Sequence, residues 1–167
     1  NELRRKRSLW MVTGAGAVLV CSAGTGPRVP GCTIGTVEDL GITDANNMGC
    51  AMAPAAYKTI RQHFEDFCTG PEDYDLIVTG DLGQLGKEVL MELARKDGIN
   101  LGGKLTDCGT MVFDPTTQDV HSGGSGCGCS AITLCSYLLK QLDKGKLRKI
   151  LFCGTGALLS PTSTQQG

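Results

Sequence analysis

Residues 121–153, HSGGSGCGCSAITLCSYLLKQLDKGKLRKILFC, combine three features that together set the class of the fold. A glycine-rich loop at 121–130 runs directly into a helix predicted over about Ser130–Lys144, whose leucines recur on one face. The apolar run Lys149–Cys153 then predicts a buried strand. A loop, a helix and a buried strand in this order are typical of α/β proteins.

The glycine-rich loop itself has the composition of an anion-binding segment. The eleven residues from His121 to Ala131 hold four glycines and three serines. Glycine lets backbone N–H groups converge without obstruction by a Cβ atom, and a helix N-terminus adds unpaired donors and partial positive charge. The loop therefore suits an anion such as a carboxylate or a phosphate. A tight turn whose glycines permit close packing is the alternative that the loop alone leaves open.

The rest of the chain alternates between segments that favour strands and segments that favour helices. The first helix is predicted from near Pro54 to Gly70, and the second over about Lys87–Lys96. Strands are expected at Met11–Val20, Cys32–Val37, Asp75–Thr79 and Thr110–Phe113. This alternation predicts α/β layers around a largely parallel sheet.

The composition limits the partners of the chain. Its 167 residues carry a formal net charge of -1, and only 5% of them are aromatic, so no nucleic-acid partner is expected. No apolar run approaches the roughly 18 residues of a membrane span, and no signal peptide is recognised, so we expect a soluble chain. The basic run Arg4–Arg7 is either a solvated terminus or a contact with a membrane surface or a partner.

Nine cysteines are present, and an odd number does not fit a complete disulfide framework. Cys21 and Cys153 fall in predicted strands, whereas Cys68 and Cys135 fall in predicted helices. We therefore expect all nine to be reduced and to pack as small apolar residues.

Two segments approach nucleotide-binding motifs without matching them. In Gly80–Glu88 five residues separate the first glycine from Gly86, and an acidic residue stands where a P-loop needs a serine or threonine. Gly14-Ala15-Gly16 lacks the third glycine of the dinucleotide fingerprint, because Leu19 occupies that position. Nucleotide binding is therefore not expected.

Metal binding is a weak alternative near the glycine-rich loop. His121, Cys127 and Cys129 could supply three ligands, but one C-x-C pair is far from the paired C-x-x-C pattern of structural zinc sites. We therefore predict no metal site. His63 lies in the middle of a predicted helix and is expected to be a surface or boundary residue.

Two aspartates stand where ligand-binding loops begin in α/β sheets. Asp81 follows one predicted strand and Asp107 precedes another. Loops at such strand ends commonly contact ligands, although either carboxylate could equally cap a turn.

Seven blocks of the sequence, taken together, closely resemble the stage V sporulation protein AD family. The blocks are Val12–Val18, Asp39–Asp44, Met48–Ala56, Asp73–Ile77 with Thr79–Leu82, Asp107–Gly109, Gly123–Ala131 and Thr155–Pro161. They occur in the family's order and spacing over about residues 10–166. Only the basic opening segment departs from the pattern.

The resemblance implies a particular fold. The family resembles thiolases and ketoacyl synthases, which implies two related halves, each a mixed sheet flanked by helices, packed into a five-layer α/β/α/β/α body. Residues 1–9 are then expected to be a basic terminal segment, and residues 10–167 an incomplete thiolase-like domain. This domain is expected to hold the end of the first half and most of the second, without the N-terminal half and a short C-terminal tail.

The resemblance also bears on catalysis. Condensing enzymes place a His in a P-H-Q-A-N type stretch, where this sequence reads Thr79–Gly83, and an Asn in a turn similar to Gly123–Gly126. Both groups are missing here, and they normally supply proton transfer and oxyanion stabilisation. We therefore expect a protein that keeps a pocket but is not an enzyme.

The ligand that the resemblance implies is dipicolinic acid, with or without Ca²⁺, and no other cofactor. The expected role is to assist dipicolinate uptake into the developing endospore, peripheral to the inner spore membrane, beside membrane-embedded channel proteins of the same system. A homodimer is also compatible with the resemblance. The glycine-rich loop offers donors to a planar dianion, whereas Asp81 and Asp107 would repel it unless they accept from a protonated ring nitrogen or meet a bridging Ca²⁺.

The residues expected to bind the ligand lie at the strand ends and in the loop. They are Asp81, Asp107, Cys108, Gly124, Ser125, Gly126, Cys127 and Cys129. Two alternatives stay open. One is an acyltransferase of the thiolase class with Cys127 or Cys129 as nucleophile, and the other is a purely structural subunit of the spore channel complex.

Overall fold

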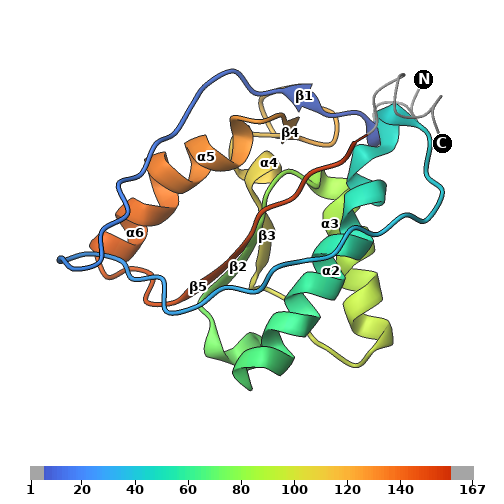
Figure 1. Cartoon of the computed structure of the whole chain (residues 1–167). Coiled ribbons are helices and arrows are strands. Elements are labelled where there is room, and N and C mark those ends of the chain that lie inside the picture. Colours follow the sequence, from blue (N-terminus) through green and yellow to red (C-terminus); the bar gives the residue numbers. More distant parts are fainter. Residues whose placement is uncertain (1–5, 159–167) are drawn as a thin grey trace.

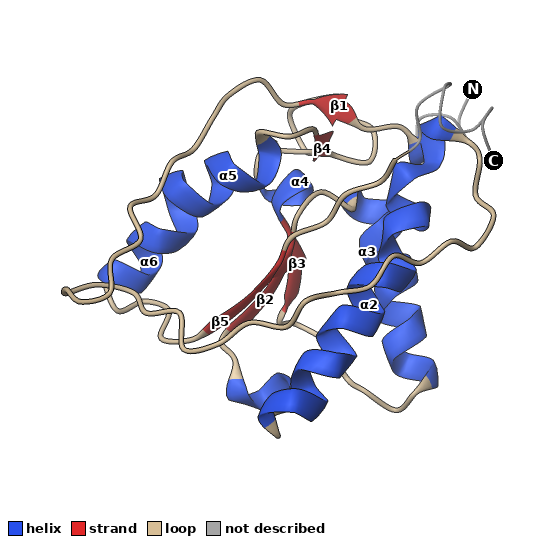
Figure 2. Ribbon diagram, in the orientation of Figure 1, coloured by secondary structure: helices blue, strands red, loops and turns tan. Residues whose placement is uncertain are grey.

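A computed structural model describes residues 6–158 of the chain. Its centre is a sheet of three parallel strands in the order β3-β2-β5 (Figures 1 and 2), formed by Leu105–Asp107, Leu76–Thr79 and Ile150–Cys153. In the central strand, Ile77 pairs with Leu105 on one side and with Leu151 on the other. A parallel sheet flanked by helices confirms the predicted α/β class.

Helices lie on both faces of this sheet (Figure 1). α2 (Met48–Phe67) and α3 (Gly83–Lys96) pack on one face. The other face is covered by α4 (Cys108–Met111) and a continuous helical run made of α5 (Cys129–Thr133), the π-helical η3 (Leu134–Leu138) and α6 (Leu139–Asp143). The described residues also include two single helical turns, η1 (Ala45–Asn47) and η2 (Pro71–Asp73).

Neighbouring residues of β2 belong to different cores. Ile77 packs with Ile60 of α2 and Leu90 of α3, whereas Val78 packs with Cys129 and Leu138 on the opposite face. All six side chains are almost completely buried. Side chains alternate across a strand, so one short apolar run can organise a core on each face of the sheet.

α2 and α3 approach each other closely at two glycines. A Cβ atom on Gly86 would lie 2.7 Å from the carbonyl oxygen of Gly49, and one on Gly49 would overlap the carbonyl oxygen of Leu82. The missing side chains therefore allow the two helices to touch through their backbones. This contact fixes the start of α3 next to the start of α2.

Two predicted strands are wrong. Residues 12–44, which we call the strap, contain no helix or strand. Of the first predicted strand, Met11–Val20, only Met11 lies in a strand, β1 (Trp10–Met11), which pairs in parallel with β4 (Gly124–Ser125). Most apolar side chains of the strap are exposed, among them Leu19, Ile34 and Val37 at 91–97%, whereas Val12 at its start is buried. The tendency of a sequence to form a strand reflects its fit on a half-buried sheet, and in the described structure no strand lies alongside these runs.

A third predicted strand is also wrong, and two helix boundaries differ from those expected. Thr110–Phe113 was predicted as a strand, but its first two residues end α4, because the Asp107 side chain accepts from the Gly109 N–H and caps a helical turn. α2 begins at Met48 rather than near Pro54, and α3 begins at Gly83 rather than Lys87. The last helical run agrees with the prediction to within one residue at each end.

All nine cysteines are free thiols. Cys108, Cys129 and Cys153 are buried, as expected for small apolar residues. The expectation of burial is wrong for four others, which are exposed: Cys21, Cys32, Cys68 and Cys127. The first two lie in the strap, where the strands that would have buried them do not form. Among the described residues, no helix has the length and apolar character needed to cross a membrane.

Candidate functional site

The carboxyl ends of the three parallel strands meet at one edge of the sheet. β2 is followed by Asp81, β3 ends at Asp107, and Thr155 comes shortly after β5. The glycine loop, residues 123–128, reaches the same edge, because Ser125 contacts Asp81 there. We call these residues together the strand-end site. In α/β proteins this edge is the usual position for a ligand.

Asp107 is fully buried and accepts four hydrogen bonds. Its Oδ2 accepts from the Thr79 hydroxyl at 2.7 Å and from the Leu82 N–H at 2.8 Å. Its Oδ1 accepts from the N–H groups of Gly83 and Gly109, each at 2.9 Å. A carboxylate has about four acceptor positions, so Asp107 has none left for a ligand while these bonds stand. The side chain joins the ends of β2 and β3 to the starts of α3 and α4.

The electrostatics of Asp107 reflect this position. Burial raises the pKa of its carboxyl, and the hydrogen bonds from Thr79, Leu82 and Gly83 oppose that rise. The nearby charge of Asp81 raises the pKa further. The negative charge of Asp81 therefore already disfavours the charged form of Asp107.

Asp81 connects the glycine loop to the segment after β5. Its Oδ2 accepts from the Ser125 hydroxyl at 2.7 Å and from the Gly126 N–H at 3.1 Å. Its Oδ1 accepts from the Thr155 hydroxyl at 2.8 Å, and its own N–H donates to Thr155 Oγ1 at 2.8 Å. Asp81 is only 8% exposed. The glycine loop thus holds a carboxylate, as its composition predicts, but this carboxylate belongs to the chain itself.

The glycines of the loop serve two purposes. A Cβ on Gly124 would lie 2.6 Å from a methyl of Val12, and one on Gly128 would overlap the carbonyl oxygen of Gly14, so these two glycines permit close packing. Gly126 has a φ of +116° and gives its N–H to Asp81. Gly124 and Gly128 therefore fit the tight-turn interpretation, and Gly126 binds a carboxylate of the chain itself. Binding of an external anion stays a prediction.

Position 80 has no space for a side chain. A Cβ on Gly80 would lie 2.8 Å from the backbone nitrogen of Thr155 and 3.1 Å from Ser130 Oγ. Distances below about 3 Å are not tolerated without movement of the backbone. The segment after β5 and the start of the last helical run therefore occupy the space in front of the end of β2.

The thiols at the strand-end site differ in their surroundings. Burial raises the pKa of Cys108 to about 12 and that of Cys129 to about 12, and the carboxylates of Asp107 and Asp81 add to both shifts. Cys153, at the end of β5, has a pKa raised to about 11 by burial. Of the thiols at this site, only that of Cys127 is exposed. The thiolate is the nucleophilic form of cysteine, so the buried thiols are poor nucleophiles near neutral pH.

The two histidines lie in separate networks. His121 Nδ1 is 2.7 Å from the Ser8 hydroxyl, and its ring meets that of Trp10 edge to face. His63 lies between Thr33 of the strap and Tyr74, with 3.0 Å to Thr33 Oγ1 and 3.1 Å to the Tyr74 hydroxyl. Between residues 6 and 158, no three His, Cys, Asp or Glu side chains are grouped to hold a metal ion.

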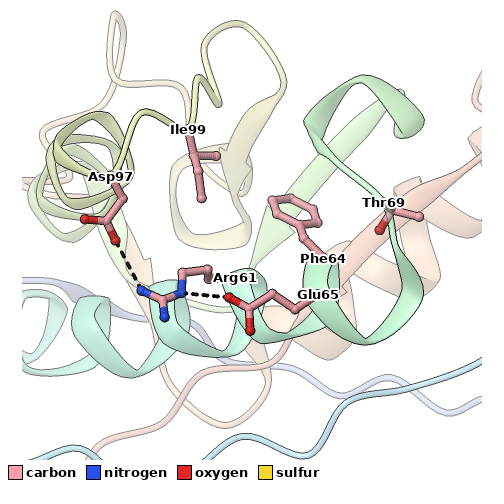
Figure 3. A pocket seen from close by; sticks show the side chains of 6 residues that line it. All are labelled: Arg61, Phe64, Glu65, Thr69, Asp97 and Ile99. Atoms are coloured by element: carbon pink, nitrogen blue, oxygen red, sulfur yellow. Dashed lines mark hydrogen bonds and ion pairs between the residues drawn. The ribbon is translucent and has the colours of Figure 1, made fainter.

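A shallow hollow of about 520 Å³ lies elsewhere, between the last turns of α2 and α3 (Figure 3). Arg61 spans it, with contacts to Glu65 at 3.2 Å and Asp97 at 3.4 Å. Asp97 also accepts from the Tyr57 hydroxyl at 2.5 Å. The charged groups that line the hollow are already paired with one another. The strand-end site lies at the opposite end of α3, so we do not assign the hollow a ligand.

Sequence reasoning missed Thr155 and Thr79, which hold the two aspartates in place. A signal for Thr155 was available, since it lies two residues after a strand that is parallel to the strand before Asp81. Thr79 is the last residue of that strand and was read as part of the core.

Comparison with known proteins agrees with the family resemblance seen in the sequence. The family model for stage V sporulation protein AD matches residues 2–167. The chain belongs to the stage V sporulation protein AD family. A curated relative, the stage V sporulation protein AD of Bacillus subtilis (strain 168), is 48% identical over 155 residues, which are 93% of this chain and 46% of the relative. The chain therefore spans about half the length of that family member, and the predicted family membership is confirmed.

Proposed function

We propose that the strand-end site is part of a non-catalytic binding site for dipicolinic acid, in a thiolase-like sporulation protein that assists dipicolinate uptake into the developing spore. Family membership supports the role in sporulation. The ligand comes from the family resemblance, and the position of the site at the carboxyl ends of parallel strands is compatible with it. The proposed partners are membrane-embedded spore channel proteins, and the proposed location is the periphery of the inner spore membrane.

The packing around Gly80 carries the proposal that the site does not catalyse. The resemblance places the His of condensing enzymes at this position, and here any Cβ would meet the backbone of Thr155 and the Ser130 hydroxyl. A side chain for proton transfer therefore does not fit without a change of the backbone. Loss of such a group typically costs a factor of about 10²–10⁴ in rate.

The buried thiols support the same proposal. Cys108 and Cys129 have pKa values of about 12, so neither ionises readily enough to attack a thioester. Cys127 is exposed but has no hydrogen-bonded His among its described contacts, and His121 contacts Ser8 instead. These observations weigh against the acyltransferase alternative.

The donors at the site suit a carboxylate ligand. The Ser125 hydroxyl and the Gly126 N–H converge on a single oxygen atom, which is the geometry a carboxylate oxygen requires. Asp81 and Asp107 add two negative charges nearby, so a bare dianion would be repelled. Calcium bound to dipicolinate would reduce that repulsion, because carboxylates are preferred Ca²⁺ ligands.

Calorimetric titration of the intact protein tests the proposal. We expect saturable binding of dipicolinate and weaker binding of benzene-1,3-dicarboxylate, which has the same two carboxylates but no ring nitrogen. Parallel titrations with and without Ca²⁺ measure the contribution of the cation. Absence of binding under both conditions would favour a structural subunit, and acyl-CoA turnover that is lost in Cys127→Ala would favour the acyltransferase.

A further inference from the structure

The donors that suit a ligand carboxylate are already occupied by the Asp81 side chain. The Ser125 hydroxyl and the Gly126 N–H both donate to Asp81 Oδ2, at 2.7 and 3.1 Å. Asp81 and Ser125 are 8% and 9% exposed, so the contact is shielded from solvent. A ligand carboxylate and Asp81 cannot both accept hydrogen bonds from the Ser125 hydroxyl and the Gly126 N–H at the same time.

The second oxygen of Asp81 has a separate anchor. Oδ1 accepts from the Thr155 hydroxyl at 2.8 Å, and Thr155 Oγ1 in turn accepts from the Asp81 N–H. The backbone of Asp81 therefore stays attached to the segment after β5 when Oδ2 leaves the glycine loop. Rotation of the carboxyl group is enough to release Ser125 and Gly126 without unfolding the end of β2.

Charge also opposes simultaneous occupation. The Asp81 charge already raises the pKa of Asp107, which shows that the two carboxylates interact across the site. A third carboxylate beside them would be repelled by both. A ligand carboxylate that takes the hydrogens of Ser125 and Gly126 therefore displaces Asp81 from the loop.

We propose that Asp81 is an internal competitor that holds the glycine loop closed, and that a ligand carboxylate binds by taking its place on Ser125 and Gly126. This inference rests on the proposed function for the identity of the ligand. It assigns Asp81 the opposite effect from that of a residue that contacts the ligand. Removal of its negative charge strengthens binding instead of weakening it.

Titration of dipicolinate into Asp81→Asn tests this assignment in the intact protein. The amide keeps an oxygen for Ser125 and Gly126 but loses the charge, and we expect about tenfold tighter binding than in wild type. Asp143→Asn, which removes the same charge from the exposed end of α6, is the matched control and should bind like wild type. If Asp81→Asn binds more weakly, Asp81 contacts the ligand directly and the inference is wrong, while the proposed function stands.

A second measurement does not depend on dipicolinate. Asp81→Ala leaves a space where the carboxyl was, and formate supplies a lone carboxylate of that size. We expect formate to raise the melting temperature of Asp81→Ala by several degrees and to shift the Gly126 amide resonance, with no such effect on wild type or Asp143→Asn.

If no variant binds dipicolinate but formate still has this effect, the proposed ligand is wrong and the carboxylate cradle stands. If formate acts equally on all three proteins, the cradle does not accept an external carboxylate and the inference fails. Should Asp81→Ala not fold, the titration of dipicolinate into Asp81→Asn decides the inference.

Discussion

The Thr155 hydroxyl holds Asp81 at two points, although the two residues are 74 positions apart in the chain. It accepts from the Asp81 N–H and donates to Asp81 Oδ1, each at 2.8 Å. This pair of bonds joins the end of β2 to the segment after β5. The glycine loop is then attached to the same carboxylate through Ser125 and Gly126.

Thr155→Val should therefore destabilise the protein. Valine has the shape of threonine but neither donates nor accepts, so the Asp81 N–H and Oδ1 both lose a partner. We expect a loss of about 1–3 kcal/mol in the free energy of unfolding, measured by urea denaturation. Thr155→Ser keeps the hydroxyl and should lose much less. Equal stability of Thr155→Val and wild type would show that these bonds contribute nothing.

The contact between α2 and α3 predicts a second stability effect. In Gly86→Ala the new methyl lies 2.7 Å from the Gly49 carbonyl oxygen, so the helices have to separate. Overpacking of this kind costs roughly 1–3 kcal/mol, which exceeds the gain of about 1 kcal/mol in helix propensity. Gly154→Ala is the control, because a Cβ there meets no atom within 4 Å. A Gly86→Ala protein more stable than wild type would contradict the close contact.

His63 predicts a loss of stability in mild acid. Burial lowers its pKa in the folded protein below the usual value of 6.5, with Lys149 adding to the effect and Asp66 opposing it. The neutral form therefore favours folding, and its contribution is present above pH 6.5 and is lost as the pH falls through the lowered pKa. We expect the difference between the free energies of unfolding of wild type and His63→Gln to shrink as the pH is lowered from 7.5 to 5. Urea denaturation at each pH measures both free energies. A difference that does not change with pH would mean that the pKa of His63 is the same in the folded and unfolded protein.

Thiol labelling should separate the cysteines by burial. In the folded protein we expect iodoacetamide at mildly alkaline pH to modify Cys127 and the exposed cysteines of the strap. Cys108 and Cys129, with pKa values of about 12, should remain unmodified until the protein is denatured. Mass spectrometry of peptides measures both groups in one experiment. Rapid labelling of Cys129 in the folded state would revive the acyltransferase alternative.

The elements that sequence predicts well are those that a single apolar pattern defines. β2 and β5 are short apolar runs, and the last helical run has leucines on one face, so their positions agree closely with the structure. The strands predicted in the strap do not form, because a run such as Cys32–Val37 has a high tendency to form a strand but forms one only beside a partner strand. α2 extends past Pro54, although proline is unfavourable inside a helix, and packing of its first turns against α3 outweighs this local preference.

The strand-end site was predicted in position but not in its bonding. Asp81 follows a predicted strand that forms as β2, whereas the strand expected after Asp107 does not form and Asp107 instead ends β3. The structure brings both aspartates to one edge of the sheet. Their partners lie as far as 74 residues away along the chain, and local patterns do not show which donor meets which carboxylate. The internal use of Asp81 by the glycine loop is for this reason a finding of the structure.

A crystal structure of the intact protein with dipicolinate tests the central claim most directly. The account predicts a ligand carboxylate within hydrogen-bonding distance of the Ser125 hydroxyl and the Gly126 N–H, with Asp81 turned away from both. Dipicolinate bound in another place, with Asp81 still on Ser125 and Gly126, would contradict the account.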